Sequence, residues 1–173
     1  KMIAGFANGY ISVVRGTPAV VQLMVIYFII FGRVFRGVPL PDYIIASIAF
    51  GINSGAYVAE IIRSGIQAVD GGQMEAARSV GFSSGEAMRL VVLPQAIRNI
   101  LPALGNEFVT VIKESSIVSV IGIADLMFRT NDVIAVTYKN LECLAVAALC
   151  YFVLTFVSGR AVSLAERKLS HGK

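Results

Sequence analysis

Polar and ionisable side chains recur at helical spacing inside otherwise apolar segments of this chain. Asn53, Tyr57 and Glu60 lie at positions i, i+4 and i+7, so a helix would carry all three on one face. A second such group comprises Glu107, Thr110 and Glu114, with Lys113 and Ser115 adjacent to it. Ionisable groups within a membrane are costly and usually face a bundle interior or a water-filled cavity. We therefore predict that both groups border an internal path or its gate. The alternative is that their charges pair with neighbours and only fix helix packing.

The chain offers little that would support bond-breaking chemistry. Its single histidine, His171, lies in the C-terminal tail, and there is no paired-histidine motif and no cluster of metal ligands. Cys143 and Cys150 lie in one apolar run without the spacing of a disulfide or metal site. There is also no Gly-x-x-x-x-Gly-Lys-Ser/Thr loop to bind ATP phosphates. We predict no catalytic residue, no metal and no cofactor on this chain, and a membrane-embedded enzyme is disfavoured.

Composition indicates an integral membrane protein. Of 173 residues, 56% are hydrophobic and 15% are charged, and the mean hydropathy is +0.74. Because soluble domains carry about a quarter charged residues, the excess apolar surface here must meet lipid or other helices. The net charge of +4 does not indicate nucleic acid, since the basic residues are scattered along the chain. We predict one all-α membrane domain over residues 1–173.

Four segments are expected to cross the membrane as helices, each at the short end of a spanning length of roughly 17–25 residues. The expected spans are roughly residues 18–32, 43–62, 95–113 and 143–160. Residues 2–15 predict an interfacial helix that leads into the first span. Residues 116–124 are apolar but too short to cross, and predict a half-helix or re-entrant piece.

Basic residues predict the orientation of these spans. Four crossings would place the start of the chain, the loop of residues 63–94 and the C-terminus on one side, and that side holds most of the arginines and lysines. Cytoplasmic loops are enriched in such residues, so the loop and the C-terminus are expected in the cytoplasm. Arg33 and Arg36 oppose this pattern locally.

Residues 63–94 predict a structured loop of two short helices with a break between them. Asp70 and Gln73 suit the start of the first helix, and Gly81 suits a left-handed residue at its end. Ser83 and Glu86 form a capping box for the second helix. Pro94 suits the first turn of the membrane helix that follows. Such a loop between spans is either a simple connector or a surface presented to a soluble partner.

The loop resembles the EAA loop of permease subunits in ATP-binding-cassette (ABC) importers. The family pattern is Glu-Ala-Ala, three residues, Gly, about nine residues, then an aliphatic residue before Leu-Pro, and every position is filled here. In that family the loop docks into the ATP-hydrolysing subunit and carries its motion to the membrane path. The resemblance assigns this coupling role to Glu75, Ala76, Ala77, Arg78, Gly81, Glu86 and Pro94.

Other segments resemble one branch of that family, the polar amino acid importers. They are Arg15-Gly16-Thr17-Pro18, Ala56 to Arg63, Pro94 to Leu104, Gly105 to Phe108, and Lys113 to Ser116. Gly71-Gly72 departs from the Pro-Gly of many relatives. The branch usually has further membrane helix before its Arg-Gly-Thr-Pro segment, which implies an N-terminally truncated chain.

The resemblance implies a type I ABC importer permease fold in the bacterial cytoplasmic membrane. It implies a dimer of cytosolic ATPases that binds ATP and Mg, a second permease subunit, identical or paralogous, and an external solute-binding protein. The cargo would be a polar amino acid, whose two charges match the carboxylates and the lysine of the polar groups. An ion- or proton-coupled carrier is the alternative, and it leaves the capped loop unexplained.

Small residues recur four apart in the second expected span, at Ser47, Gly51, Gly55 and Ala59. This spacing lets membrane helices approach closely. We predict that the stripe packs helices, within the subunit or between two permeases, and that it binds no ligand.

Overall fold

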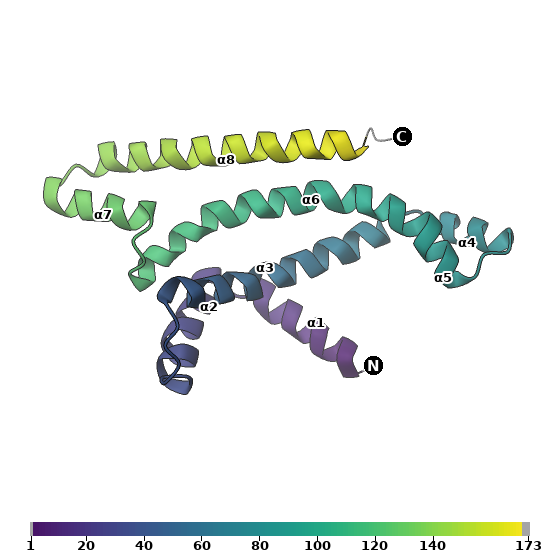
Figure 1. Cartoon of the computed structure of the whole chain (residues 1–173), viewed down its shortest axis with the longest axis horizontal. Coiled ribbons are helices and arrows are strands. Elements are labelled where there is room, and N and C mark those ends of the chain that lie inside the picture. Colours follow the sequence, from purple (N-terminus) through teal and green to yellow (C-terminus); the bar gives the residue numbers. More distant parts are fainter. Residues whose placement is uncertain (1, 171–173) are drawn as a thin grey trace.

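The computed structural model describes residues 2–170, and the side chains of residues 2–167, and it contains no strand in that part of the chain. The elements in order are α1 (Met2–Arg15), α2 (Ala19–Met24), η1 (Val25–Val34), α3 (Asp42–Gln67), α4 (Gly71–Ser79), α5 (Ser84–Ala87), η2 (Met88–Val92), α6 (Leu93–Glu114), η3 (Ser115–Ile121), α7 (Leu126–Thr137) and α8 (Asn140–Ser170). Figure 1 shows α3, α6 and α8 as neighbouring rods, with α4, α5 and both chain ends towards one end and α7 at the other. The loop, the start of α1 and the end of α8 therefore lie towards the same end of the described structure. Their expected place in the cytoplasm stays a prediction.

The chain turns sharply between α1 and α2. Pro18 precedes α2 in an extended conformation, with φ −63° and ψ 137°, and it has no N–H with which to continue α1. The two helical segments on either side differ in direction by 108°. η1 continues α2 as a π-helical stretch, so the first expected span corresponds to α2 and η1 together.

Two helices in the described part of the chain, α3 and α8, are long and apolar enough to cross a membrane, and the bent pair of α1 with α2–η1 would make a third. α6 spans 22 residues but does not meet the same apolar criterion. Its sequence explains why, because Arg98, Asn106, Glu107 and Lys113 interrupt the apolar residues. The crossing of α6 therefore stays a prediction.

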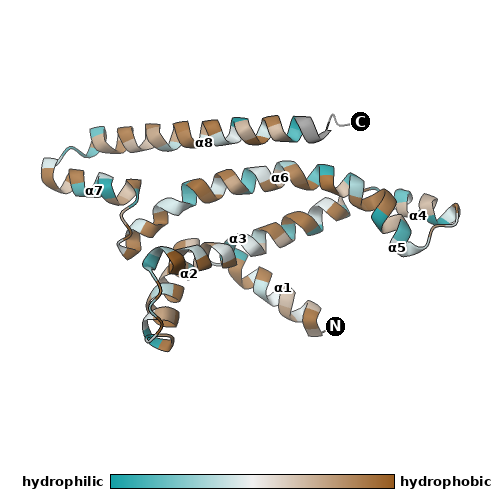
Figure 2. Cartoon of the chain, viewed as in Figure 1, coloured by the Kyte–Doolittle hydropathy of each residue, from teal (hydrophilic) through white to brown (hydrophobic). Residues whose placement is uncertain are grey.

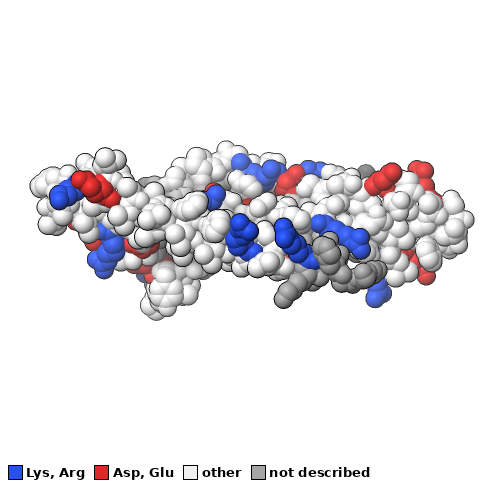
Figure 3. All heavy atoms as spheres, turned by 90° about the horizontal axis from the view of Figure 1, so that it is seen from above, with Lys and Arg blue, Asp and Glu red and all other residues white. Residues whose placement is uncertain are grey.

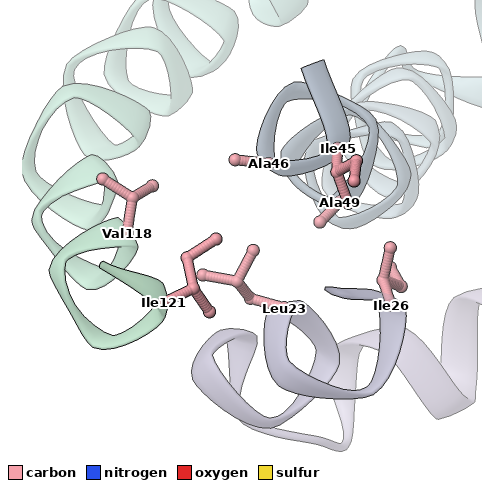
Figure 4. Close-up of a cluster of buried hydrophobic side chains, with 7 residues drawn as sticks. All are labelled: Leu23, Ile26, Ile45, Ala46, Ala49, Val118 and Ile121. Atoms are coloured by element: carbon pink, nitrogen blue, oxygen red, sulfur yellow. The ribbon is translucent and has the colours of Figure 1, made fainter. Parts of the chain in front are cut away.

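The apolar core lies where α2, η1 and η3 meet the first half of α3 (Figure 4). Its buried members are Leu23, Ile26, Ile45, Ala46, Ala49, Val118 and Ile121. The expected half-helix is a 3₁₀ stretch, η3, that follows α6 directly and ends at Gly122 with φ 84°. The sequence analysis did not predict α7, although Asp125 caps it by accepting a hydrogen bond of 2.8 Å from the Phe128 N–H.

Most of the remaining apolar surface is exposed. Figure 2 shows hydrophobic residues along the whole visible length of α8, and a window of α8 long enough to span is only 6% buried. Figure 3 shows a largely uncharged band between the charged groups at the α7 end and the basic groups further along. Such a band is the surface that lipid covers in a spanning bundle.

Glycines bring the three long helices together, but not the glycines that the four-residue stripe predicted. A Cβ atom at Gly65 would lie 2.3 Å from Ile100 Cγ1, and one at Gly105 would lie 2.1 Å from Val162 Cγ1. Ser47 and Gly51 are exposed, and a Cβ at Gly51, which lines a cleft between α3 and α6, meets nothing within 4 Å. A Cβ at Gly55 would lie 3.1 Å from the Tyr10 hydroxyl of α1. The stripe is therefore not where α3 and α6 approach most closely, and its role in helix packing, within the subunit or between two permeases, stays a prediction.

Candidate functional site: the loop and the polar groups

The first half of the loop is closed at both ends by local hydrogen bonds. Asp70 Oδ1 accepts a bond of 2.9 Å from the Gly72 N–H and so caps α4. At the other end Gly81 adopts φ 99°, its N–H donates to Arg78 O at 3.1 Å, and the Phe82 N–H donates to Ala77 O at 3.2 Å. This pair of bonds is a Schellman motif, which needs a left-handed residue at the glycine position. Both predicted ends of the first helix are confirmed.

The second half of the loop begins with the predicted capping box. Ser83 Oγ accepts a bond of 3.3 Å from the Glu86 N–H, while the Ser83 N–H donates to Glu86 Oε2 at 2.9 Å. The Ser83 hydroxyl also donates to Glu86 Oε2 at 2.7 Å. Both bonds stabilise the charged carboxylate and lower the pKa of Glu86, with the backbone N–H of Ser83 contributing more than its hydroxyl.

α5, η2 and α6 follow one another without an intervening loop. Pro94 lies at the second position of α6, after the π-helical turn of η2, and it cannot donate a backbone hydrogen bond. A π-helical turn re-routes backbone bonds and so accommodates the proline ring. Gln95 Nε2 donates to Val91 O at 3.0 Å and to Gln73 Oε1 at 3.2 Å, which ties α4 to the start of α6.

The loop exposes an apolar tip that the sequence analysis did not single out. Val80 is 77% exposed, Phe82 39% and Leu90 58%. The signal in the sequence was three large apolar residues within a charged loop. The predicted coupling residues around them are exposed, namely Glu75, Ala76, Arg78, Gly81, Glu86 and Pro94. Ala77 is instead buried, because it packs within the loop.

The loop also contains the spacing Gly81-x-Ser83-x-Gly85, which the sequence analysis overlooked and which is the pattern of a hydrolase nucleophile. That motif requires a strand before the serine, whereas α4 precedes it here. The Ser83 hydroxyl is committed to Glu86 as a helix cap. The structure therefore gives this serine a structural role.

The polar group on α3 divides between two sets of partners. Asn53 is buried, and its Nδ2 donates to Gln22 Oε1 of α2 at 3.0 Å. Glu60 accepts two hydrogen bonds from the Arg63 guanidinium and lies 3.5 Å from Arg15 Nη1. Arg15 also lies 5.6 Å from the centre of the Tyr57 ring.

The polar group on α6 faces a different part of α3. Glu107 Oε1 accepts a bond of 3.0 Å from the Ser54 hydroxyl, and both residues line a cleft of about 320 Å³ between the two helices. Lys113 is exposed, Glu114 is half-buried, and the Ser115 hydroxyl donates back to Ile112 O at 2.8 Å.

The structure therefore joins Glu107 to α3 through Ser54, which the sequence analysis did not name, and not through Asn53, Tyr57 or Glu60. A carboxylate at this cleft, half-buried and held by one hydroxyl, has acceptor positions left for a cationic group. Within the described residues no group of three histidines, cysteines or carboxylates is placed to hold a metal ion.

The model of the family described as binding-protein-dependent transport system inner membrane component matches residues 1–171. The chain belongs to this family. The arginine transport system permease protein ArtQ of Bacillus subtilis (strain 168) is 46% identical over 163 residues, which are 94% of this chain and 74% of that protein. The glutamine transport system permease protein GlnP of Escherichia coli (strain K12) is 38% identical over 180 residues, covering 97% of this chain and 82% of that protein.

A solved structure gives the same result for the fold. A chain in a crystal structure of an amino acid ABC transporter with histidines is 52% identical, with a TM-score of 0.82, and the match covers 93% of this chain and 74% of that chain. The permease therefore has the type I ABC importer fold that the motifs predicted. Membership places it in the bacterial inner membrane, in a class of transport systems that work with an ATPase and a binding protein.

Proposed function

We propose that this permease is the transmembrane subunit of an ATP-driven importer that moves a polar amino acid into the bacterial cytoplasm by alternating access. The observation that carries the proposal is the loop of residues 70–94, in which two capped helices hold an exposed apolar tip beyond the ends of α3 and α6. Local hydrogen bonds make the loop a rigid element, and rigid elements carry displacements between sites. A soluble partner that moves the tip would thus move both long helices.

The partner is a dimer of cytosolic ATPases, which binds the ATP and Mg. ATP binding closes the dimer, the loop of residues 70–94 follows, and the helices open outward to accept solute from an external binding protein. Hydrolysis and product release then restore the inward-facing state. A second permease subunit, identical or paralogous, completes the path, and the loop and the C-terminus lie in the cytoplasm.

The cleft at Ser54 and Glu107 supports a cationic group as part of the cargo. A half-buried carboxylate with free acceptor positions attracts an ammonium or guanidinium group, and every amino acid carries an ammonium. The names of the relatives, which are arginine and glutamine permeases, support the same class of substrate. Lys113 and Glu114 then belong to the outer part of the path, beyond Glu107 along α6.

The test compares wild-type permease with Gly81→Asp in complexes co-expressed with the candidate ATPase and binding protein. An aspartate at Gly81 would be strained at a φ of 99°, so the Schellman turn should open. Less ATPase should then co-purify with the permease, which is the measure of ATPase capture. Gly85→Asp is the matched control, because Gly85 lies in the first turn of α5 with nothing within 4 Å of a Cβ. An acidic residue is favourable at that place in a helix.

Loss of ATPase capture and of amino acid uptake in Gly81→Asp alone, with normal membrane insertion, is the expected result. A wild-type complex that captures no ATPase, and whose uptake survives ATP depletion but collapses with a protonophore, would instead identify an ion-coupled carrier.

A further inference from the structure

Gln22 is the polar centre of the corner between α1 and α2. Its Nε2 donates to Val14 O at 2.7 Å, to Thr17 O at 3.0 Å and to Thr17 Oγ1 at 2.8 Å. The two carbonyl oxygens fix the orientation of the amide, because the opposite orientation would place Oε1 against both of them, and the Thr17 hydroxyl donates its own hydrogen to Val13 O. Gln22 Oε1 therefore points away from the corner.

That oxygen meets Asn53 on α3. Asn53 Nδ2 donates to it at 3.0 Å, and Asn53 is only 6% exposed. The neighbouring apolar contacts between α2 and α3, such as Leu23 against Ala49, carry no preferred direction, so they permit sliding. The amide pair is directional and fixes the register of the corner against α3.

Contacts from α1 reach the same stretch of α3. The Tyr10 hydroxyl donates to Ile52 O, and it lies 3.1 Å from where a Cβ at Gly55 would be. Arg15, at the end of α1, approaches Tyr57 and Glu60 further along α3. The corner is thus fastened to α3 over residues 52–60.

α3 continues from this stretch to Gln67, and Asp70 begins the loop three residues later. A displacement of the loop therefore passes along α3 to the amide pair. We propose that Gln22 and Asn53 are positioning residues for transport, which make the α1–α2 corner move as one body with α3 and the loop. This inference rests on the proposed function, because it requires a loop that an ATPase moves.

The test measures amino acid uptake and ATP hydrolysis together, in reconstituted complexes of the full permease with its ATPase and binding protein. Gln22→Leu and Asn53→Leu replace each amide by a branched apolar side chain and remove the directional bond. Each should lower the amino acid moved per ATP by roughly 3- to 30-fold, the range expected for a residue that couples two sites. ATPase capture and basal hydrolysis should stay at wild-type levels.

The double variant should lose no more than Gln22→Leu alone, because Gln22→Leu already breaks the Gln22–Asn53 bond together with the bonds of Gln22 to Val14 and Thr17, whereas Asn53→Leu breaks only the Gln22–Asn53 bond. Thr155→Val is the matched control, since the Thr155 hydroxyl bonds only within α8, to Tyr151 O at 2.8 Å and to Phe152 O at 3.1 Å. The inference would be overturned if either single variant moved an amount of amino acid per ATP within twofold of wild type. It would also be overturned if the losses of the two single variants multiplied in the double variant. Failure of the wild type to import would overturn the proposed function instead.

A second measurement does not depend on the variants folding. Spin labels at Phe6 of α1 and Ile62 of α3, both exposed, would be placed in a background lacking Cys143 and Cys150. The distance between them should be the same with and without trapped ATP. A change in this distance between the two states, in a permease that keeps Gln22 and Asn53, would show that the α1–α2 corner moves relative to α3. That result would overturn the inference.

Discussion

Gly65→Ala tests the contact that sets the spacing of α3 and α6. The added Cβ would lie 2.3 Å from Ile100 Cγ1 and 3.2 Å from Ile100 Cδ1, and Ile100 is buried, with 8% exposed. A contact that short cannot exist, so the two helices must separate or Ile100 must leave its rotamer. The site lies near the loop ends of both helices, where loop motion enters the bundle.

The expected cost follows from two opposing effects. Overfilling a well-packed contact costs about 1–3 kcal/mol. Replacing glycine by alanine within a helix returns about 0.5–1 kcal/mol. The net loss therefore lies between about 0 and 2.5 kcal/mol, and its centre, about 1 kcal/mol, corresponds to a fall of roughly 2–4 °C in the melting temperature of a chain of this size.

Thermal melting of the purified complex in detergent measures this loss. Gly159→Ala on α8 is the control, because nothing lies within 4 Å of its added Cβ, and its melting temperature should equal or exceed that of wild type. Ile100→Ala removes the clashing atoms, so combining it with Gly65→Ala should cost less than the sum of the two single changes. A Gly65→Ala variant as stable as Gly159→Ala would refute the close contact.

Two further predictions concern the loop and the path. Ser83 lowers the pKa of Glu86, so the cap stabilises the loop fully at pH values above the ordinary glutamate pKa of about 4.3. That stabilisation is lost as the pH falls through the lowered pKa of Glu86. The protection of the loop amides, corrected for the intrinsic pH dependence of amide exchange, should therefore fall on acidification in wild type but not in Glu86→Gln, and equal changes would contradict it. In the path, Glu107→Gln should slow uptake in liposomes by roughly 10-fold or more, with Ser54→Ala affecting it less. Glu114→Gln should also slow uptake, and normal kinetics in both glutamine variants would remove these carboxylates from the path.

The loop was predictable because its structure is local. Asp70, Gly81, Ser83 and Glu86 bond to residues at most three positions away, or end a helix by their own φ, so residue type and spacing were enough. α3 and α8 were predictable for a similar reason, since long uncharged runs in the sequence mark them directly. The exposed tip and the burial of Ala77 were not, because they depend on how α4 folds against η2.

The pairing of helix faces was decided by the tertiary structure. An apolar helix that meets lipid on some sides and protein on others carries apolar residues all round, so its sequence does not mark the inner face. Gly51 and Gly65 look alike in the sequence, yet an added Cβ would collide with Ile100 of α6 at Gly65 and would meet nothing within 4 Å at Gly51. Likewise Asn53 and Glu107 were both recognisable as polar residues at membrane depth. Their partners, Gln22 and Ser54, lie 31 and 53 residues away, and only the packing of α2, α3 and α6 brings them together.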